Sequence, residues 1–251
     1  MSAMKKAGVE VEATPMRASS AGRQLMTLAE QIAERISLSI ATGDYAPGDR
    51  IREEAIAEQL EVSRGPVREA LRILERDAVV RIQPHRGAHV TQLSIREVGD
   101  LFEIRRDLIG AMVRRLAAGD HDFIAAIDTG VCELEAAANG SAGVDAYLAI
   151  SNRLGRLLAD ASRNERLAEI LGSLARQTRR YSMLGLASAV RREESARTWR
   201  SMANALKAGD AHVAADAIED LIDALRREAI RRLQAADAAL DSLTNSKDGS
   251  P

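Results

Sequence analysis

The sequence has few aromatic residues and few prolines. Phenylalanine, tyrosine and tryptophan make up 2% of the 251 residues, and only five residues are proline. Alanine, leucine, arginine and glutamate are abundant, which favours helices packed through small side chains over a β-rich core. A chain of this length has room for two medium-sized domains. We therefore expect a mostly α-helical protein with two domains.

Cysteine and long apolar runs are also scarce. The single Cys132 cannot form a disulfide within the chain, and residues 1–24 lack the apolar core of a signal peptide. Charged residues interrupt every helix-like segment, so no run approaches the roughly 20 apolar residues that cross a bilayer. These absences predict a cytoplasmic protein without a membrane segment.

A large excess of either charge is missing as well. The net charge is −2 at pH 7, so the chain is not coated in positive charge. Between Ser63 and Gln92, however, six arginines stand against three acidic residues, a local excess of three positive charges. Any site for a polyanion is therefore expected to be local.

The most informative stretch is a predicted helix over residues 63–75. Ser63 is a suitable N-cap, and Pro66 lies in the first turn, where its missing N–H is not needed. The residues that recur at helical spacing and form one apolar face are Val67, Ala70, Leu71 and Leu74. The arginines spaced by four that form a basic stripe beside this face are Arg64, Arg68 and Arg72. Such a helix fits a DNA groove.

Shorter predicted elements surround this helix. Apolar spacing predicts helices over residues 27–41 and 53–60, with a turn at Pro47-Gly48 between them. The second helix is joined closely to the basic one, as in a helix-turn-helix. The β-prone runs at residues 79–82 and 88–91 predict a hairpin, which would form a wing.

Three spaced motifs fall in this region. They read PGDRIRE from Pro47, LxVSRxPVREALxxLE from Leu60, and RGAxV from Arg86. In order and spacing they closely resemble the winged helix-turn-helix of GntR-type bacterial transcription regulators. One departure is Asp77-Ala78, where that family usually has an acidic residue followed by glycine. This departure lies outside the basic helix.

The resemblance implies a set of DNA-binding residues. They are Arg52, Ser63, Arg64, Gly65, Pro66, Arg68, His85, Arg86 and Gly87. Arg64 and Arg68 would face the major groove, where arginine pairing with guanine is worth about 1–3 kcal/mol of discrimination. The wing residues would reach the minor groove or the backbone, and Arg52 and Ser63 would contact phosphates or base edges. Arg72, Arg76 and Arg81 are interpreted instead as solvated surface.

From residue 93 onward the patterns predict helices only. Ser94 and Glu97 form a capping-box signature, and later stop and start signals divide residues 95–240 into six or seven helices. The motifs LxExRxxL from Leu101, ASxN from Ala161 and ALxAGD from Ala205 resemble the all-helical FCD-type effector domain of the FadR branch of the GntR family. The expected organisation is a flexible tail (1–23), a winged helix-turn-helix domain (24–92), an all-α helical-bundle effector and dimerisation domain (93–240) and a second tail (241–251).

Most members of that branch bind a divalent metal through an aspartate and three histidines. Alignment on Asn164 and Gly209-Asp210 places other residues at those four positions, namely Ser151, Gly155, Trp199 and Leu221. None of them replaces a missing histidine. The chain has four histidines, and none lies near Gly155 or Leu221. We therefore expect neither a metal nor another cofactor.

Any effector would then be held by side chains. Arg105 matches the family's arginine on the first helix of the domain, and its burial would require either an anionic effector or an internal salt bridge. Arg179 and Tyr181 belong to a cluster that suits either a pocket rim or a helix surface. Trp199 could fill the space left by the metal, or could simply pack. An organic acid or acyl compound is the expected class of effector.

These inferences predict a cytoplasmic, homodimeric, ligand-responsive repressor that binds a palindromic operator in double-stranded DNA, because two heads related by a two-fold axis read such a site. One alternative is a regulator whose second domain only dimerises. From another class, the alternative is a metabolic enzyme with a helix-turn-helix appendage. No Gly-rich phosphate loop, nucleophile elbow or pair of catalytic carboxylates supports that class.

Overall fold

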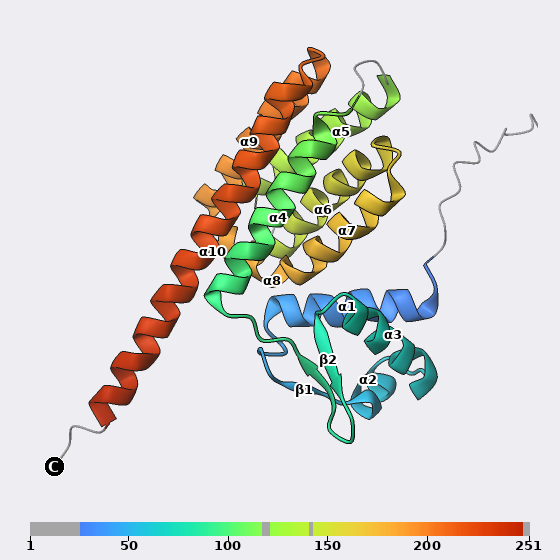
Figure 1. The fold of residues 1–251 in the computed structure, drawn as a ribbon, viewed down its shortest axis with the longest axis vertical. Helices are drawn as coiled ribbons and strands as arrows, with labels where there is room; N and C mark the ends of the chain where they lie inside the picture. The colour runs from blue at the N-terminus through green and yellow to red at the C-terminus, as the bar shows by residue number, and fades with distance from the viewer. Residues whose placement is uncertain (1–25, 117–120, 141–142, 248–251) are drawn as a thin grey trace, which may run out of the picture.

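The computed structural model describes residues 26–116, 121–140 and 143–247, and it folds into two domains (Figure 1). A small domain with helices and a sheet lies at one end of a larger helical bundle. The tail expected over residues 1–23 lies outside the described residues. The mostly α-helical prediction is confirmed.

The small domain begins with α1 (Leu28–Thr42). Thr27 and Glu30 form a capping box at its start, and Gly43 ends it with a φ of 97°, a conformation that glycine adopts without strain. Of the apolar residues predicted from the four-residue spacing, Ile32, Ile36 and Ile40 are buried in the core of this domain, whereas Leu28 in the first turn is exposed. The predicted first helix is therefore confirmed.

Two helices follow, α2 (Glu53–Gln59) and α3 (Arg64–Arg76). The predicted apolar face of α3 is buried against α1 and the sheet, through Val67, Ala70, Leu71 and Leu74. Ser63 occupies the N-cap position with an extended backbone, but its hydroxyl makes no capping hydrogen bond. The prediction for Ser63 was therefore right in position and wrong in mechanism, because a suitable residue type does not by itself orient the side chain.

The sheet has three antiparallel strands in the order β1-β3-β2. The predicted hairpin is confirmed as β2 (Val80–Gln83) and β3 (Gly87–Val90). The sequence predicted only a turn before α2, whereas β1 (Arg50–Ile51) adds a third strand there by pairing with β3. A strand of two residues is too short to show an alternating pattern.

The larger domain contains seven helices among the described residues, in agreement with the predicted six or seven. They are α4 (Ile95–Val113), α5 (His121–Asn139), α6 (Val144–Ala161), α7 (Glu165–Gln177), α8 (Arg179–Gly185), α9 (Ala189–Lys207) and α10 (Ala211–Lys247). The predicted Ser94–Glu97 capping box opens α4. In Figure 1, α10 runs along the bundle and continues beyond it, past the expected boundary at residue 240.

The two domains meet where α1 packs against α8. On its other side α8 packs against α10, and Gly185 makes this possible because a Cβ there would lie 2.9 Å from the carbonyl oxygen of Leu225. Helix α8 therefore joins the bundle to the small domain. Among the described residues, no helix combines the length and the apolar character needed to span a membrane.

Candidate functional site

Two exposed arginines lie near the start of α3. Arg64 forms an ion pair of 3.0 Å with Glu54, and Arg68 forms one of 3.2 Å with Glu53. Both carboxylates belong to the first turn of α2. More than half of each arginine side chain is exposed, and ion pairs of this kind contribute little stability. Phosphates or base edges can therefore replace the carboxylates at low cost.

The remaining predicted DNA-binding residues also lie on the surface of the small domain. Arg52, Ser63 and Gly65 are exposed, and Pro66 is half-buried. The hairpin places His85 and Arg86 exposed at its tip, followed by the half-buried Gly87. His85 and Gly87 both have positive φ, at 63° and 85°, which produces the tight turn. The hairpin tip lies at the end of the molecule away from the bundle (Figure 1).

A cavity of about 150 Å³ lies within the helical domain. Its apolar wall comes from α4, α6, α7 and α10, through Ile109, Met112, Leu148, Leu171, Leu221 and Leu225. The polar side chains that line it are Arg105, Ser151, Asn152, Arg156, Arg176, Arg179, Ser182 and Trp199 of the helical domain and Glu34 of α1. The cavity thus combines apolar volume with several cationic groups and one carboxylate.

Arg105 is the most deeply placed of these cations. Its Nη1 donates to the hydroxyl oxygens of Thr178 at 3.1 Å and Ser182 at 3.5 Å. Burial lowers the pKa of Arg105 to about 10, so the guanidinium remains charged at pH 7. Within the part of the chain that the structure describes, no carboxylate pairs with it. The internal salt bridge considered as one alternative is not formed.

Trp199 is buried and lines the same cavity. Its indole N–H is a buried donor for which the described residues supply no acceptor. A buried donor without an acceptor costs free energy. Trp199 therefore packs in the core and lines the cavity, while its N–H stays inside the protein without an acceptor among the described residues.

Comparisons with known proteins agree with this geometry. Residues 28–90 match the family described as "Bacterial regulatory proteins, gntR family", and residues 100–224 match the "FCD domain". The "Probable D-xylose utilization operon transcriptional repressor" of Paenarthrobacter nicotinovorans is 31% identical over 195 residues, which cover 76% of this chain and 84% of that relative. The chain belongs to the GntR family.

Two further matches agree with this assignment. The "Uncharacterized HTH-type transcriptional regulator YdhC" of Bacillus subtilis (strain 168) is 28% identical over 142 residues, which cover 56% of this chain and 63% of that relative, less than two thirds of its length. The solved structure of E. coli McbR/YncC has the same fold, with a TM-score of 0.73 and 18% identity over 83% of this chain and all of that chain. This GntR protein is thus a DNA-binding transcription regulator with an FCD effector domain, and not an enzyme.

The positions of the family's metal ligands converge on the cavity of this GntR protein. Ser151 and Gly155 of α6, Trp199 of α9 and Leu221 of α10 all line it. Gly155 and Leu221 have no donor atom, and a neutral hydroxyl and an indole N–H are unsuitable ligands for a divalent transition metal. Nowhere in the described residues do three or more His, Cys, Asp or Glu side chains form a possible metal cluster. The residues present do not fit the family's metal.

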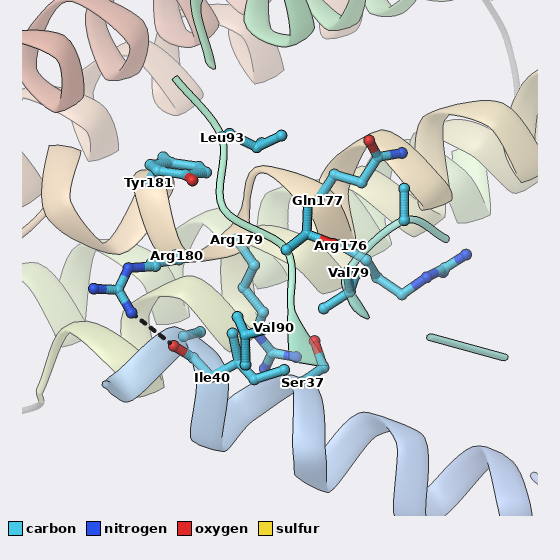
Figure 2. Close-up of a pocket in the computed structure, with 13 residues that line it drawn as sticks. Ser37, Ile40, Val79, Val90, Leu93, Arg176, Gln177, Arg179, Arg180 and Tyr181 are labelled. Atoms are coloured by element: carbon cyan, nitrogen blue, oxygen red, sulfur yellow. Dashed lines mark hydrogen bonds between the residues drawn. The ribbon is translucent and has the colours of Figure 1, made fainter. Parts of the chain in front are cut away.

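Three arginines of α7 and α8 connect the helical domain to the small domain, and Figure 2 labels them and marks the hydrogen bond from Arg180 to Ile40. Arg176 donates two hydrogen bonds, of 2.6 and 2.9 Å, to the buried carboxylate of Asp77 at the end of α3. The Nη1 of Arg179 donates to Glu34 of α1 at 2.6 Å. Arg180 donates to the carbonyl oxygens of Ile40 and Tyr45 at 3.4 Å.

Arg176, Glu34 and Asp77 were not among the predicted site residues. Asp77 appeared in the sequence prediction only as part of the Asp77-Ala78 pair, in which alanine stands where the family usually has glycine. Its partner Arg176 lies 99 residues away, and Glu34 and Arg179 are 145 residues apart. No local spacing signals pairs at such separations, although the unusual Asp77-Ala78 turn was a partial signal. Ala78 adopts a φ of 55°, a conformation that glycine favours.

Tyr181 does not line the cavity of the helical domain. It lines a second cavity of about 30 Å³ at the domain junction, beside Leu93 of the connecting segment (Figure 2). Burial raises the pKa of Tyr181 above its usual value, so the phenol stays neutral. The two members of the predicted cluster are thus placed differently, since Arg179 lines both cavities and Tyr181 lines only the one at the junction.

Proposed function

We propose that this GntR protein is a cytoplasmic, homodimeric, metal-free repressor that leaves a palindromic operator when an organic anion binds its FCD domain. The relative from Paenarthrobacter nicotinovorans carries the description of a repressor, which supports this direction of control. A homodimer would present two α3 helices to the two halves of a palindrome. The nine predicted DNA-binding residues remain our proposal for the contact surface.

The partly buried Arg105 carries the proposal for the effector. It lines a cavity, bears a charge and has only two hydroxyl groups as partners in the described residues. A buried charge is stabilised most by an oppositely charged group that also accepts its hydrogen bonds. The ligand class that fits is therefore a carboxylate or another organic anion.

The apolar wall sets the size of the rest of the ligand. A cavity of about 150 Å³ lined by aliphatic side chains holds a molecule of benzene size. Benzoate and hexanoate combine an apolar body of that size with a carboxylate, and they are suitable first probes.

Trp199 provides a direct test because it is the only tryptophan in the chain. We expect titration with benzoate or hexanoate to change its fluorescence in a saturable way, with the same affinity in the presence of a chelator. Replacing Arg105 by Met removes a charged hydrogen-bonding group, which is worth about 1.5–3 kcal/mol, so binding should weaken about 10- to 150-fold.

Arg166→Met is the matched control, because Arg166 is an exposed arginine of α7 that does not line the cavity. Its titration should coincide with that of the wild-type protein. Equal affinity of the wild-type protein for benzoate and for neutral benzamide would contradict an anionic effector, since a charged anchor distinguishes the two.

A further inference from the structure

A carboxylate of the DNA-binding domain lies in the wall of the effector cavity. Glu34 of α1 lines the cavity, and its Oε1 accepts a hydrogen bond of 2.6 Å from Nη1 of Arg179. Arg179 is nearly buried, with 11% of its side chain exposed, whereas 52% of the Glu34 side chain is exposed. The arginine is therefore held at the cavity, while the carboxylate is free to turn toward solvent.

The pairing of Arg179 with Glu34 is incomplete. Glu34 accepts from Nη1 only, and Nε of Arg179 is buried with no acceptor supplied by the described residues. A carboxylate placed in the cavity can accept a charge-assisted hydrogen bond from an Nη of Arg179, as Glu34 does. An anionic ligand therefore offers Arg179 the same chemistry as Glu34.

We propose that Glu34 and the anionic effector compete for Arg179, so that effector binding breaks the ion pair that ties α1 to α8. This inference rests on the proposed function, because it requires an anion in the cavity. In this arrangement the carboxylate of Glu34, which belongs to the DNA-binding domain, competes with the ligand for the guanidinium of Arg179.

The competition has a structural consequence for the DNA-binding domain. Helix α1 packs on α3, which carries Arg64 and Arg68, and also on α8. Loss of the Glu34–Arg179 pair leaves α1 attached to α8 through Arg180, while Arg176 still holds Asp77 at the end of α3. The DNA-binding domain then keeps the contacts of Arg176 and Arg180 and loses that of Arg179, so α1 can move relative to α8. Such a movement would change the distance between the two DNA-binding domains of a dimer.

Glu34→Gln tests the competition by removing the competing charge without changing a group of the helical domain. The side chain is half exposed, so the fold should tolerate the change. Benzoate and hexanoate should bind at least fivefold more tightly to this variant in the Trp199 titration, because Arg179 no longer has to leave a carboxylate. By linkage, saturating ligand should weaken operator binding by a correspondingly smaller factor than in the wild-type protein.

Glu103→Gln is the matched control. Glu103 pairs with Arg226 at 2.6 Å, its side chain has the same 52% exposure, and neither residue lines the cavity. Its ligand affinity should stay within twofold of the wild-type value. If Glu34→Gln also stays within twofold while the wild-type protein binds the probe, the competition is overturned and the effector proposal stands. If neither probe binds the wild-type protein, both proposals fail together.

Discussion

Arg64 and Arg68 illustrate how the free protein holds the side chains that are proposed to meet DNA. Each arginine lies against a carboxylate of α2, Glu54 or Glu53, while more than half of its surface remains exposed. These ion pairs orient the guanidinium groups, and each contributes little to the stability of the fold. Arg105 is in a different situation, since burial lowers the pKa of its guanidinium and it has no charged partner among the described residues. Exposure thus separates the arginines proposed to contact DNA from the one proposed to anchor an anion.

At this scale the first prediction concerns Arg68. Arg68→Ala should weaken specific operator binding by about 1–3 kcal/mol, because a base contact by arginine carries that much discrimination. Arg72→Ala is the control, since the sequence interpretation places Arg72 on the solvated surface and its ion pair is with Glu69 of the same helix. Anisotropy titrations with operator DNA and with a scrambled duplex separate a loss of specific binding from a loss of non-specific binding. Equal losses on both duplexes would argue that Arg68 contacts phosphates only.

At the scale of elements, α8 is the short helix that connects the DNA-binding domain to the helical bundle. It spans seven residues, and it packs against α1 of the DNA-binding domain and against α10 of the bundle. Its first turn carries Arg179 and Arg180, and its last residue, Gly185, lies against the backbone of α10. Helix α8 therefore belongs both to the cavity wall and to the domain junction, so a displacement of α8 at the cavity also alters its contacts with α1.

A glycine substitution tests this close packing. Gly185→Ala should destabilise the protein by about 1–3 kcal/mol, because the added Cβ would lie 2.9 Å from a carbonyl oxygen of α10, and a backbone atom cannot move aside alone. Gly155→Ala is the matched control in α6, where nothing lies within 4 Å of the added Cβ. It should be neutral or stabilising by up to about 1 kcal/mol, since alanine favours the helix. Urea unfolding of the two variants provides the comparison.

At the scale of the whole molecule, the proposed dimer requires a surface for self-association. Ile104 of α4 and Ile170 of α7 each expose 50% of their surface, and these two helices contact each other. Exposed apolar side chains on neighbouring helices favour an interface. The long α10 and the arginine ties at the junction place each DNA-binding domain relative to such an interface.

The corresponding prediction is that Ile104→Glu combined with Ile170→Glu lowers the dimer fraction at least tenfold, because two buried carboxylates per subunit would face the partner without a cation. Val213→Glu changes an equally exposed apolar residue at the start of α10 and should leave the dimer intact. Analytical ultracentrifugation measures the oligomeric state. A monomeric wild-type protein at micromolar concentration would contradict the homodimer itself.

The sequence by itself determined the elements whose signals are local. The apolar face of α3, the capping box at Ser94 and the hairpin of the wing were predictable because their interactions lie within a few residues along the chain. The family motifs added the likeness to GntR regulators. The two-residue β1 and the unused hydroxyl of Ser63 escaped prediction, because each depends on contacts with other segments.

Only the tertiary structure decided what surrounds each charge. Arg105 was expected to be buried, but its lack of a carboxylate partner follows from the tertiary packing of α4, which places the hydroxyls of Thr178 and Ser182 against it. The pairing of Glu34 with Arg179 across 145 residues, in the wall of a cavity, depends on the docking of two domains. Periodicity along one helix fixes which face is buried, and it carries no information about which distant group that face will meet.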